Sequence, residues 1–303
     1  MRGRRGSATV TATQLAWCVT ASCLWAATHG SLSRIGDHAM ANTLTRRPTL
    51  WFEPKYAHFS RPLPRIAPRC DDLRMAVQQL SAEEAIAEVK DGDTIMVGGF
   101  GLVGAPLSLI DALVEQSSAT DLTVISNNVG EPGRGLGLLL RQGRIRKSIA
   151  SFFTSNPEAV EAASSGALEY ELIPQGTLAE AIRAGGAGIR GFYTPVGAGT
   201  DLAAGHEQRE IDGVLCVLQP PITADVALIY ATWGDQLGNL RYRRTAQNFN
   251  PAMASAATLT IAEVAELCEP GGIEPENVHT PHLFVNRIVP STLRLADVPG
   301  AGT

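Results

Sequence analysis

Residues 91–106 read DGDTIMVGGFGLVGAP and form the stretch of this chain that is most informative about its fold. The turn residues Asp91-Gly92-Asp93 precede a short apolar run, Thr94-Ile95-Met96-Val97, which is typical of a strand buried in a parallel sheet. The glycine-rich loop that follows ends at Pro106, and proline is favoured at the first position of a helix. The stretch therefore predicts a strand, a loop and a helix in direct succession.

The alternation of strands and helices continues on both sides of this stretch. Ser81-Ala82-Glu83-Glu84 is a capping box that begins a helix, and apolar residues follow it at helical spacing. Further helices are expected to begin at Ser155-Asn156-Pro157-Glu158 and at the capping box Thr177-Leu178-Ala179-Glu180. Strands are expected at 122–125, 149–153, 168–173, 214–218, 226–232, 258–263 and 282–289. Short strands that alternate with helices predict an α/β fold with an open, mostly parallel sheet flanked by helices.

The chain divides by composition into residues 1–74 and residues 75–303. The first part contains 11 Lys and Arg against 4 Asp and Glu, whereas the second contains 14 against 26. Residues 1–36 contain no acidic residue and resemble a weak targeting signal, although polar residues interrupt the apolar run. We expect residues 1–74 to be a leader that arises from an upstream start codon, with a targeting peptide or a functional extension as alternatives. Residues 75–303 are expected to form one domain.

The second part of the chain indicates which partners to expect. Its acidic balance argues against broad nucleic-acid binding, because phosphate contacts require a basic surface. Arg241-Tyr242-Arg243-Arg244 is a lone basic run, which is more typical of a solvated strand or an interface. Cysteine and histidine residues lack the spacing of a metal site, and Cys216 lies in an apolar run where a buried hydrophobic role is expected. The sequence also offers no credible membrane-spanning run. We therefore expect a cytoplasmic protein that binds no metal, nucleic acid or membrane and acts on small molecules.

The glycine loop allows three interpretations. Residues 99–104 spell GxGxxG between a predicted strand and a predicted helix, which is the setting of a nicotinamide-dependent oxidoreductase. In that class the next strand ends in an acid that binds the ribose, but the strand at 122–125 ends in Ser126-Asn127-Asn128. A structural tight turn is the second interpretation. In the third, glycines before a helix leave backbone N–H groups bare, which suits an anionic group or a developing oxyanion.

Three amide side chains follow predicted strands. Asn127 and Asn128 lie at the carboxyl end of the strand at 122–125, where open α/β sheets place ligands, and Gln175 lies just before a predicted helix. Amides donate hydrogen bonds without bringing charge. The alternatives are turn residues for the two asparagines and a polar loop residue for Gln175.

Taken together, these motifs resemble the A (alpha) subunit of the coenzyme A transferase family I. Residues 91–106 are similar to the first signature of that family, in which an Asp-Gly turn and three apolar residues precede Gly-Gly-Phe and a later Gly-x-Pro. The resemblance covers about residues 76–290 and continues, in the same order, with Ser126-Asn127-Asn128, Gly135–Leu140, Pro174–Glu180, Ile182–Gly188, Phe192–Pro195, Gly238–Leu240, Asn248–Pro251 and His279–Pro281.

The resemblance implies a reaction and a partner. In this family CoA passes by a ping-pong mechanism from an acyl-CoA to the free carboxylate of a 3-oxoacid, so CoA thioesters are substrates and no cofactor is bound permanently. A glutamate in a Ser-Glu-Asn-Gly motif of a separate B (beta) subunit is the nucleophile. This chain lacks that motif, and Glu276-Asn277 lies in a proline-containing turn and is rejected as a substitute. The chain is therefore expected to be active only with a B subunit, in a heterodimer or heterotetramer.

The resemblance also implies roles for individual residues. Asn127 contributes to an oxyanion hole, and Gln175 orients the nucleophile or the substrate. The substrate and CoA channel is lined by Gly98, Gly99, Phe100, Gly101, Gly104 and Asn128.

Two segments bear on the substrate. Phe153–Glu158 and Pro195–Leu202 are more similar to 3-oxoadipate-type subunits of aromatic catabolism than to the acetoacetate-using relatives of ketone body metabolism. The expected acceptor is therefore 3-oxoadipate, with acetoacetate next, and succinyl-CoA is the expected donor. The alternative hypotheses are a nicotinamide-dependent oxidoreductase and a non-catalytic orphan binding subunit.

Overall fold

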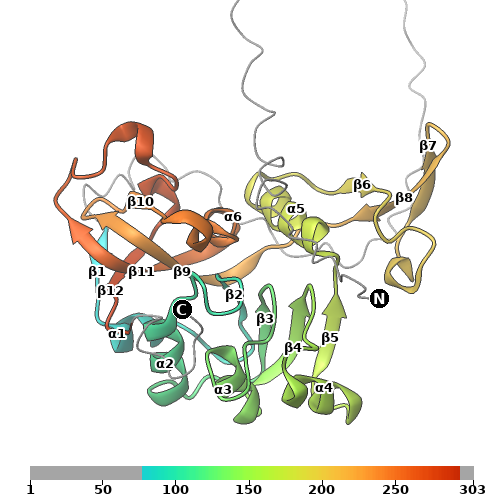
Figure 1. Cartoon of the computed structure of the whole chain (residues 1–303), viewed down its shortest axis with the longest axis horizontal. Helices are drawn as coiled ribbons and strands as arrows, with labels where there is room; N and C mark the ends of the chain where they lie inside the picture. Colours follow the sequence, from blue (N-terminus) through green and yellow to red (C-terminus); the bar gives the residue numbers. More distant parts are fainter. Residues whose placement is uncertain (1–76, 294–303) are drawn as a thin grey trace, which may run out of the picture. The chain divides into compact units, whose positions relative to one another are not determined.

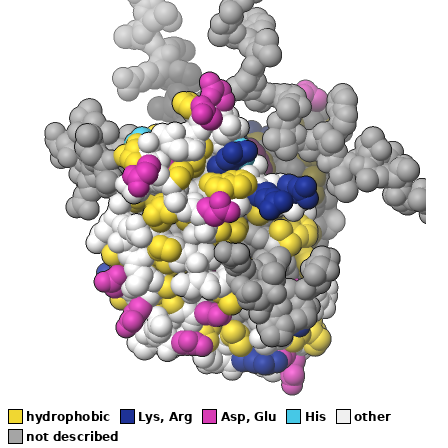
Figure 2. Space-filling view, turned by 60° about the vertical axis from the view of Figure 1, so that its left-hand side comes forward, with side chains coloured by type: hydrophobic (Ala, Val, Ile, Leu, Met, Phe, Trp, Pro, Cys, Tyr) yellow, Lys and Arg dark blue, Asp and Glu magenta, His cyan; other side chains and the backbone are white. Residues whose placement is uncertain are grey.

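The computed structural model describes residues 77–293. The leader expected at residues 1–74 lies outside these residues. No helix within 77–293 is long and apolar enough to cross a membrane. On the face of the molecule drawn in Figure 2, acidic and basic side chains both occur, and neither sign forms a continuous band.

The predicted parallel sheet is confirmed and contains nine strands within the described residues. Eight of them lie side by side and pair in parallel with their neighbours. Their order is β1 (Gln78–Gln79), β12 (Arg287–Pro290), β11 (Ala257–Cys268), β9 (Ala224–Asp235), β2 (Thr94–Val97), β3 (Leu122–Ile125), β4 (Ile145–Ala150) and β5 (Glu169–Leu172). The short strand β10 (Leu240–Arg241) pairs with β9 in the antiparallel direction.

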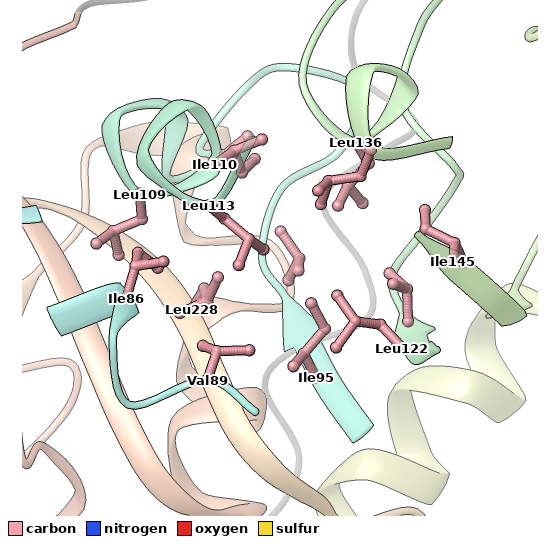
Figure 3. Close-up of a cluster of buried hydrophobic side chains, with 14 of the residues drawn as sticks. Ile86, Val89, Ile95, Leu109, Ile110, Leu113, Leu122, Leu136, Ile145 and Leu228 are labelled. Carbon is pink, nitrogen blue, oxygen red and sulfur yellow. The ribbon is translucent and has the colours of Figure 1, made fainter. Parts of the chain in front are cut away.

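Helices cover both faces of this sheet (Figure 1). One face carries α1 (Ala82–Ile86), α2 (Leu107–Glu115), α3 (Leu136–Arg141) and α4 (Pro157–Ser164), and the other carries α5 (Gln175–Gly186) and α6 (Asn250–Ser255). Side chains alternate between the two faces along a strand. Ile95 and Val97 of β2 therefore pack in the first core, and Met96 packs in the second. Figure 3 shows Leu109 and Leu113 of α2 pointing toward the sheet in the first core.

A buried carboxylate fixes the amino end of α2 on the sheet. Glu263 of β11 accepts hydrogen bonds from the backbone N–H groups of Ser108 (2.9 Å) and Leu109 (3.2 Å), and from the hydroxyls of Ser108 (2.9 Å) and Ser291 (2.6 Å). Burial raises the pKa of the Glu263 carboxyl, and these hydrogen bonds lower it in part. The bonds satisfy N–H groups that have no partner within the helix.

A second, smaller sheet extends the molecule beyond α5. It is antiparallel and contains β6 (Phe192–Thr194), β8 (Val214–Gln219) and β7 (Gln208–Ile211) in that order. The strand predicted at 214–218 is confirmed as β8, but it pairs in this sheet and not in the parallel one. Cys216 on this strand is buried, as predicted.

The structure confirms one of the predicted capping boxes and corrects the other, and it shortens one predicted strand. The capping box at Ser81 is confirmed, because its hydroxyl accepts from Glu84 N–H (3.2 Å) and Glu84 accepts from Ser81 N–H (2.9 Å). The capping box at Thr177 is wrong: α5 already begins at Gln175, and Thr177 is buried inside its first turn. The strand predicted at 282–289 is wrong in its first half, where His282–Phe284 form a 3-10 turn.

Candidate active site

The carboxyl ends of the parallel strands bring three of the predicted loops to one edge of the sheet. β2 leads into the glycine loop, defined here as residues 98–104, and β3 leads into Ser126-Asn127-Asn128. The chain leaves β5 through Pro174 and enters α5 at Gln175. Parallel strands end at the same edge, so residues far apart in the chain meet there.

A small pocket lies between the glycine loop and the end of β3. Its volume is about 10 Å³, which is room for about one water molecule. Among the predicted site residues it is lined by Gly98, Gly99, Gly101, Asn127 and Asn128. Phe100 and Gly104 do not line it: the Phe100 side chain is 48% exposed, and Gly104 packs closely on Ala246 and Asn248.

The side chains of Asn127 and Gln175 contact each other. Gln175 Nε2 donates a 2.8 Å hydrogen bond to Asn127 Oδ1. The other end of the Asn127 amide, Nδ2, is buried and has no hydrogen-bond partner among residues 77–293, and Asn127 as a whole is only 1% exposed. A buried donor without a partner is destabilising by about 1–3 kcal/mol, and such groups are rare enough to require an explanation. Asn127, which lines the pocket, therefore has a donor that no described residue uses.

The backbone of the glycine loop is less available than the sequence suggested. The N–H of Gly98 donates to Leu228 O (2.9 Å), that of Gly99 donates to Asn248 Oδ1 (3.1 Å), and that of Phe100 donates to Val103 O (3.0 Å). The expectation that this loop leaves bare N–H groups is wrong for these three residues: Gly98 and Gly99 bond to distant segments, and Phe100 bonds within the loop. The side chain of Asn127 provides a donor without a partner among residues 77–293.

Within the described part of the chain, no lining residue of the pocket is an acid, a base or a thiol. Ser126 lines it, but its hydroxyl donates to the carbonyl of Asn128. Glu276 lies in the 3-10 turn Pro275–Asn277 and is not a lining residue. Among residues 77–293, no group of three His, Cys, Asp or Glu side chains is placed to bind a metal ion. The pocket can donate a hydrogen bond to a polar group but offers no nucleophile of its own.

The structure does not favour a dinucleotide site at the GxGxxG loop. β3 ends at Ile125 and is followed by Ser126 and Asn127, with an amide where an acid would bind the ribose. Asp121 lies at the opposite end of β3 and forms an exposed ion pair with Arg146 (3.3 Å).

Sequence reasoning missed three asparagines that support the site. Asn156 was recognised only as a helix start, and it does cap α4. Its fully buried amide also donates to Val129 O (3.2 Å) and so holds the loop that follows Asn128. Asn248 and Asn250 contact the glycine loop. The available signal was two amides spaced two residues apart before a proline, in Asn248-Phe249-Asn250-Pro251.

Comparison with known proteins gives a consistent picture. A family model described as coenzyme A transferase matches residues 79–291. The chain is 50% identical over 227 residues to the A subunit of a probable succinyl-CoA:3-ketoacid coenzyme A transferase from Mycobacterium tuberculosis, and the match covers 69% of this chain and 91% of the relative. It is 49% identical over 211 residues to the A subunit of a 3-oxoadipate CoA-transferase from Pseudomonas putida (69% and 91%).

A solved structure shows a similar fold. The acyl-CoA transferase YdiF of E. coli O157:H7, in its thioester complex with CoA, superposes with a TM-score of 0.65 at 21% identity. The match covers 78% of this chain and 50% of the YdiF chain, so this chain spans half the length of that relative.

Proposed function

The chain belongs to the coenzyme A transferase family, and from this premise we propose that it is the A subunit of an enzyme that transfers CoA from succinyl-CoA to a 3-oxoacid. Its relatives are named as A subunits of succinyl-CoA:3-ketoacid and 3-oxoadipate transferases. The partner is then a B subunit, in a heterodimer or heterotetramer.

The observation that carries the proposal is the free amide of Asn127. When a nucleophile adds to a thioester, the carbonyl oxygen gains negative charge, and a preorganised donor stabilises that charge in the transition state. Asn127 Nδ2 is such a donor, because it is buried, unpartnered within residues 77–293 and held in one orientation by the 2.8 Å bond from Gln175. In this proposal Asn127 forms part of the oxyanion hole, and Gln175 positions it.

The nucleophile comes from the B subunit. The pocket has no acid among its described lining residues, so the glutamate that the family mechanism requires reaches it from another chain. That glutamate attacks the thioester carbonyl of succinyl-CoA, which releases CoA thiolate and leaves a mixed anhydride. The thiolate then attacks the glutamyl carbonyl, which releases succinate and leaves a glutamyl-CoA thioester. The acceptor carboxylate takes CoA from this thioester by the same two steps in reverse, so one difficult exchange becomes two easier half-reactions. The glycine loop lines the channel in which this thioester lies.

The favoured acceptor is 3-oxoadipate, with acetoacetate second. The preference is carried by the segments 153–158 and 195–202. The second of these lies close to the site: a Cβ added at Gly197 would be 4.0 Å from Pro174 Cγ, and Pro174 directly precedes Gln175. We infer that residues 195–202 contribute to the choice of acceptor.

A reconstituted pair tests the proposal. The chain is co-expressed with a partner that carries the Ser-Glu-Asn-Gly motif, and transfer from succinyl-CoA is measured with 3-oxoadipate and with acetoacetate. We expect transfer by the pair, none by either protein alone, and a higher kcat/KM for 3-oxoadipate. Trapping of a CoA thioester on the glutamate of the partner would support the covalent step. Absence of transfer with both acids, or transfer by the isolated chain, would refute the proposal.

A further inference from the structure

Two amide side chains form hydrogen bonds to the backbone of the glycine loop. Asn248 Oδ1 accepts from Gly99 N–H (3.1 Å), and Asn248 Nδ2 donates to Val103 O (3.0 Å). Asn250 Nδ2 donates to Gly104 O (3.0 Å). The two asparagines therefore contact the start and the end of a loop that lies about 145 residues before them in the chain.

Both asparagines are themselves fixed. Asn250 is completely buried, and it also donates to Ala246 O (2.9 Å) and accepts from Tyr230 N–H of β9 (3.1 Å). Asn248 also donates to Thr245 O (3.0 Å) and accepts from Phe249 N–H (2.7 Å). Every polar atom of the two amides is engaged, so the segment acts as a rigid support tied to the central sheet.

The glycines of the loop permit this close approach. A Cβ at Gly98 would overlap with Oδ1 of Asn250, and a Cβ at Gly104 would lie 2.5 Å from Ala246 O. Gly104 also has a φ of +69°, a conformation that glycine adopts without strain. Glycine at these two positions is thus explained by packing against the support and not by contact with a ligand.

Gly98, Gly99, Gly101 and Leu102 of the loop line the small pocket, which Asn127 also lines. We propose that Asn248 and Asn250 are positioning residues, which hold the glycine loop as a fixed wall of that pocket. For catalysis the inference rests on the function proposed above. An error of about 1 Å in the placement of reacting groups lowers rates by about a hundredfold, so a wall that moves lowers kcat more than it changes KM.

Asn248 is the better residue to change. Its φ is +21°, so Asn248→Gly removes the amide without straining the backbone. Asn248→Asp keeps an acceptor for Gly99 N–H but loses the donor to Val103 O. Replacement of Asn250 would remove the donor to Gly104 O and Ala246 O and an acceptor for Tyr230 N–H, and it risks unfolding the chain. Asn239→Ala is a matched control, because this amide joins Asp235 and His282 and is not a lining residue of the pocket.

Two measurements on the co-expressed complex test the proposal. The first is amide hydrogen exchange of peptides that span residues 98–104. In Asn248→Gly these peptides should exchange about tenfold faster than in wild type. The increase should be smaller in Asn248→Asp, and Asn239→Ala should exchange at the wild-type rate. The second is transfer kinetics, where we expect kcat of Asn248→Gly to fall about 10- to 100-fold with KM nearly unchanged, and Asn248→Asp to be intermediate.

Each outcome decides a separate part. An unchanged exchange rate in Asn248→Gly would refute the statement that Asn248 holds the glycine loop, whatever the activity of the variant. Faster exchange with an unchanged kcat would overturn the positioning role. A wild-type complex without transfer would refute the proposed function, while the exchange measurement would still decide whether the asparagines hold the loop.

Discussion

Replacing Asn127 by alanine separates its role in the reaction from its role in stability. The substitution removes one hydrogen bond from Gln175, whose side chain is exposed and can bond to water instead, so the loss is about 1 kcal/mol. It also removes the buried Nδ2 without a partner within residues 77–293, which relieves a penalty of about 1–3 kcal/mol. These terms oppose each other. We expect the free energy of unfolding to change by no more than about 2 kcal/mol, which shifts Tm by less than about 8 °C.

The same substitution should strongly reduce the reaction rate. Loss of one oxyanion donor lowers kcat by about a hundred- to a thousandfold, or roughly 3–4 kcal/mol of transition-state stabilisation. The assay is transfer from succinyl-CoA by the reconstituted pair, with Tm measured on the same preparation. Asn239→Ala provides the converse control: both ends of that amide are bonded, so it should lower Tm but leave the rate unchanged. A rate for Asn127→Ala within about threefold of wild type would refute the assignment of its amide.

Three further substitutions follow from the geometry. Gln175→Ala leaves the amide of Asn127 free to rotate and should lower kcat about tenfold; an unchanged rate in the same assay would show that the 2.8 Å bond has no catalytic role. Gly98→Ala forces a Cβ into the space of a buried amide oxygen and should destabilise the fold by about 3 kcal/mol or more in urea denaturation, whereas Gly176→Ala, in open space on α5, should be neutral or slightly stabilising. Burial raises the pKa of Glu263 above the ordinary value of 4.5, so the folded state binds this proton more tightly than the unfolded state does. The contribution of this carboxyl to the free energy of unfolding therefore falls as pH rises from 4.5 through the folded pKa. The free energy of unfolding of Glu263→Gln should decline less with pH than that of wild type, and parallel curves for the two proteins would contradict this.

Local sequence signals identified much of the fold correctly. The run at 94–97 is a strand buried on both faces, as its four successive residues without charge predict for a sheet covered on both sides. The capping box at Ser81 is confirmed because all its partners lie within four residues. The box at Thr177 is wrong because the N-cap of α5 is Pro174, three residues before Thr177, and Thr177 is buried within the first turn.

Local signals also predicted part of the candidate site. Asn127, Asn128 and Gln175 follow strands, and parallel strands end at one edge, so their proximity follows from topology. That Phe100 and Gly104 line the CoA channel stays a prediction; among the described residues Phe100 is exposed, Gly104 packs on the segment at 246–248, and neither lines the small pocket. Neighbours in sequence need not share a surface, because the loop turns between them.

The sequence by itself determined the α/β class, the order of the strands along the chain and the loops that carry the polar residues, since these depend on periodicity and turn chemistry over a few residues. Only the tertiary structure decided which polar atoms remain free. The backbone donors of Gly98 and Gly99 are used by β9 and by Asn248, while one donor of Asn127 has no partner within residues 77–293. Hydrogen-bond partners of this kind come from segments more than a hundred residues away, and their distances are set by how the layers pack.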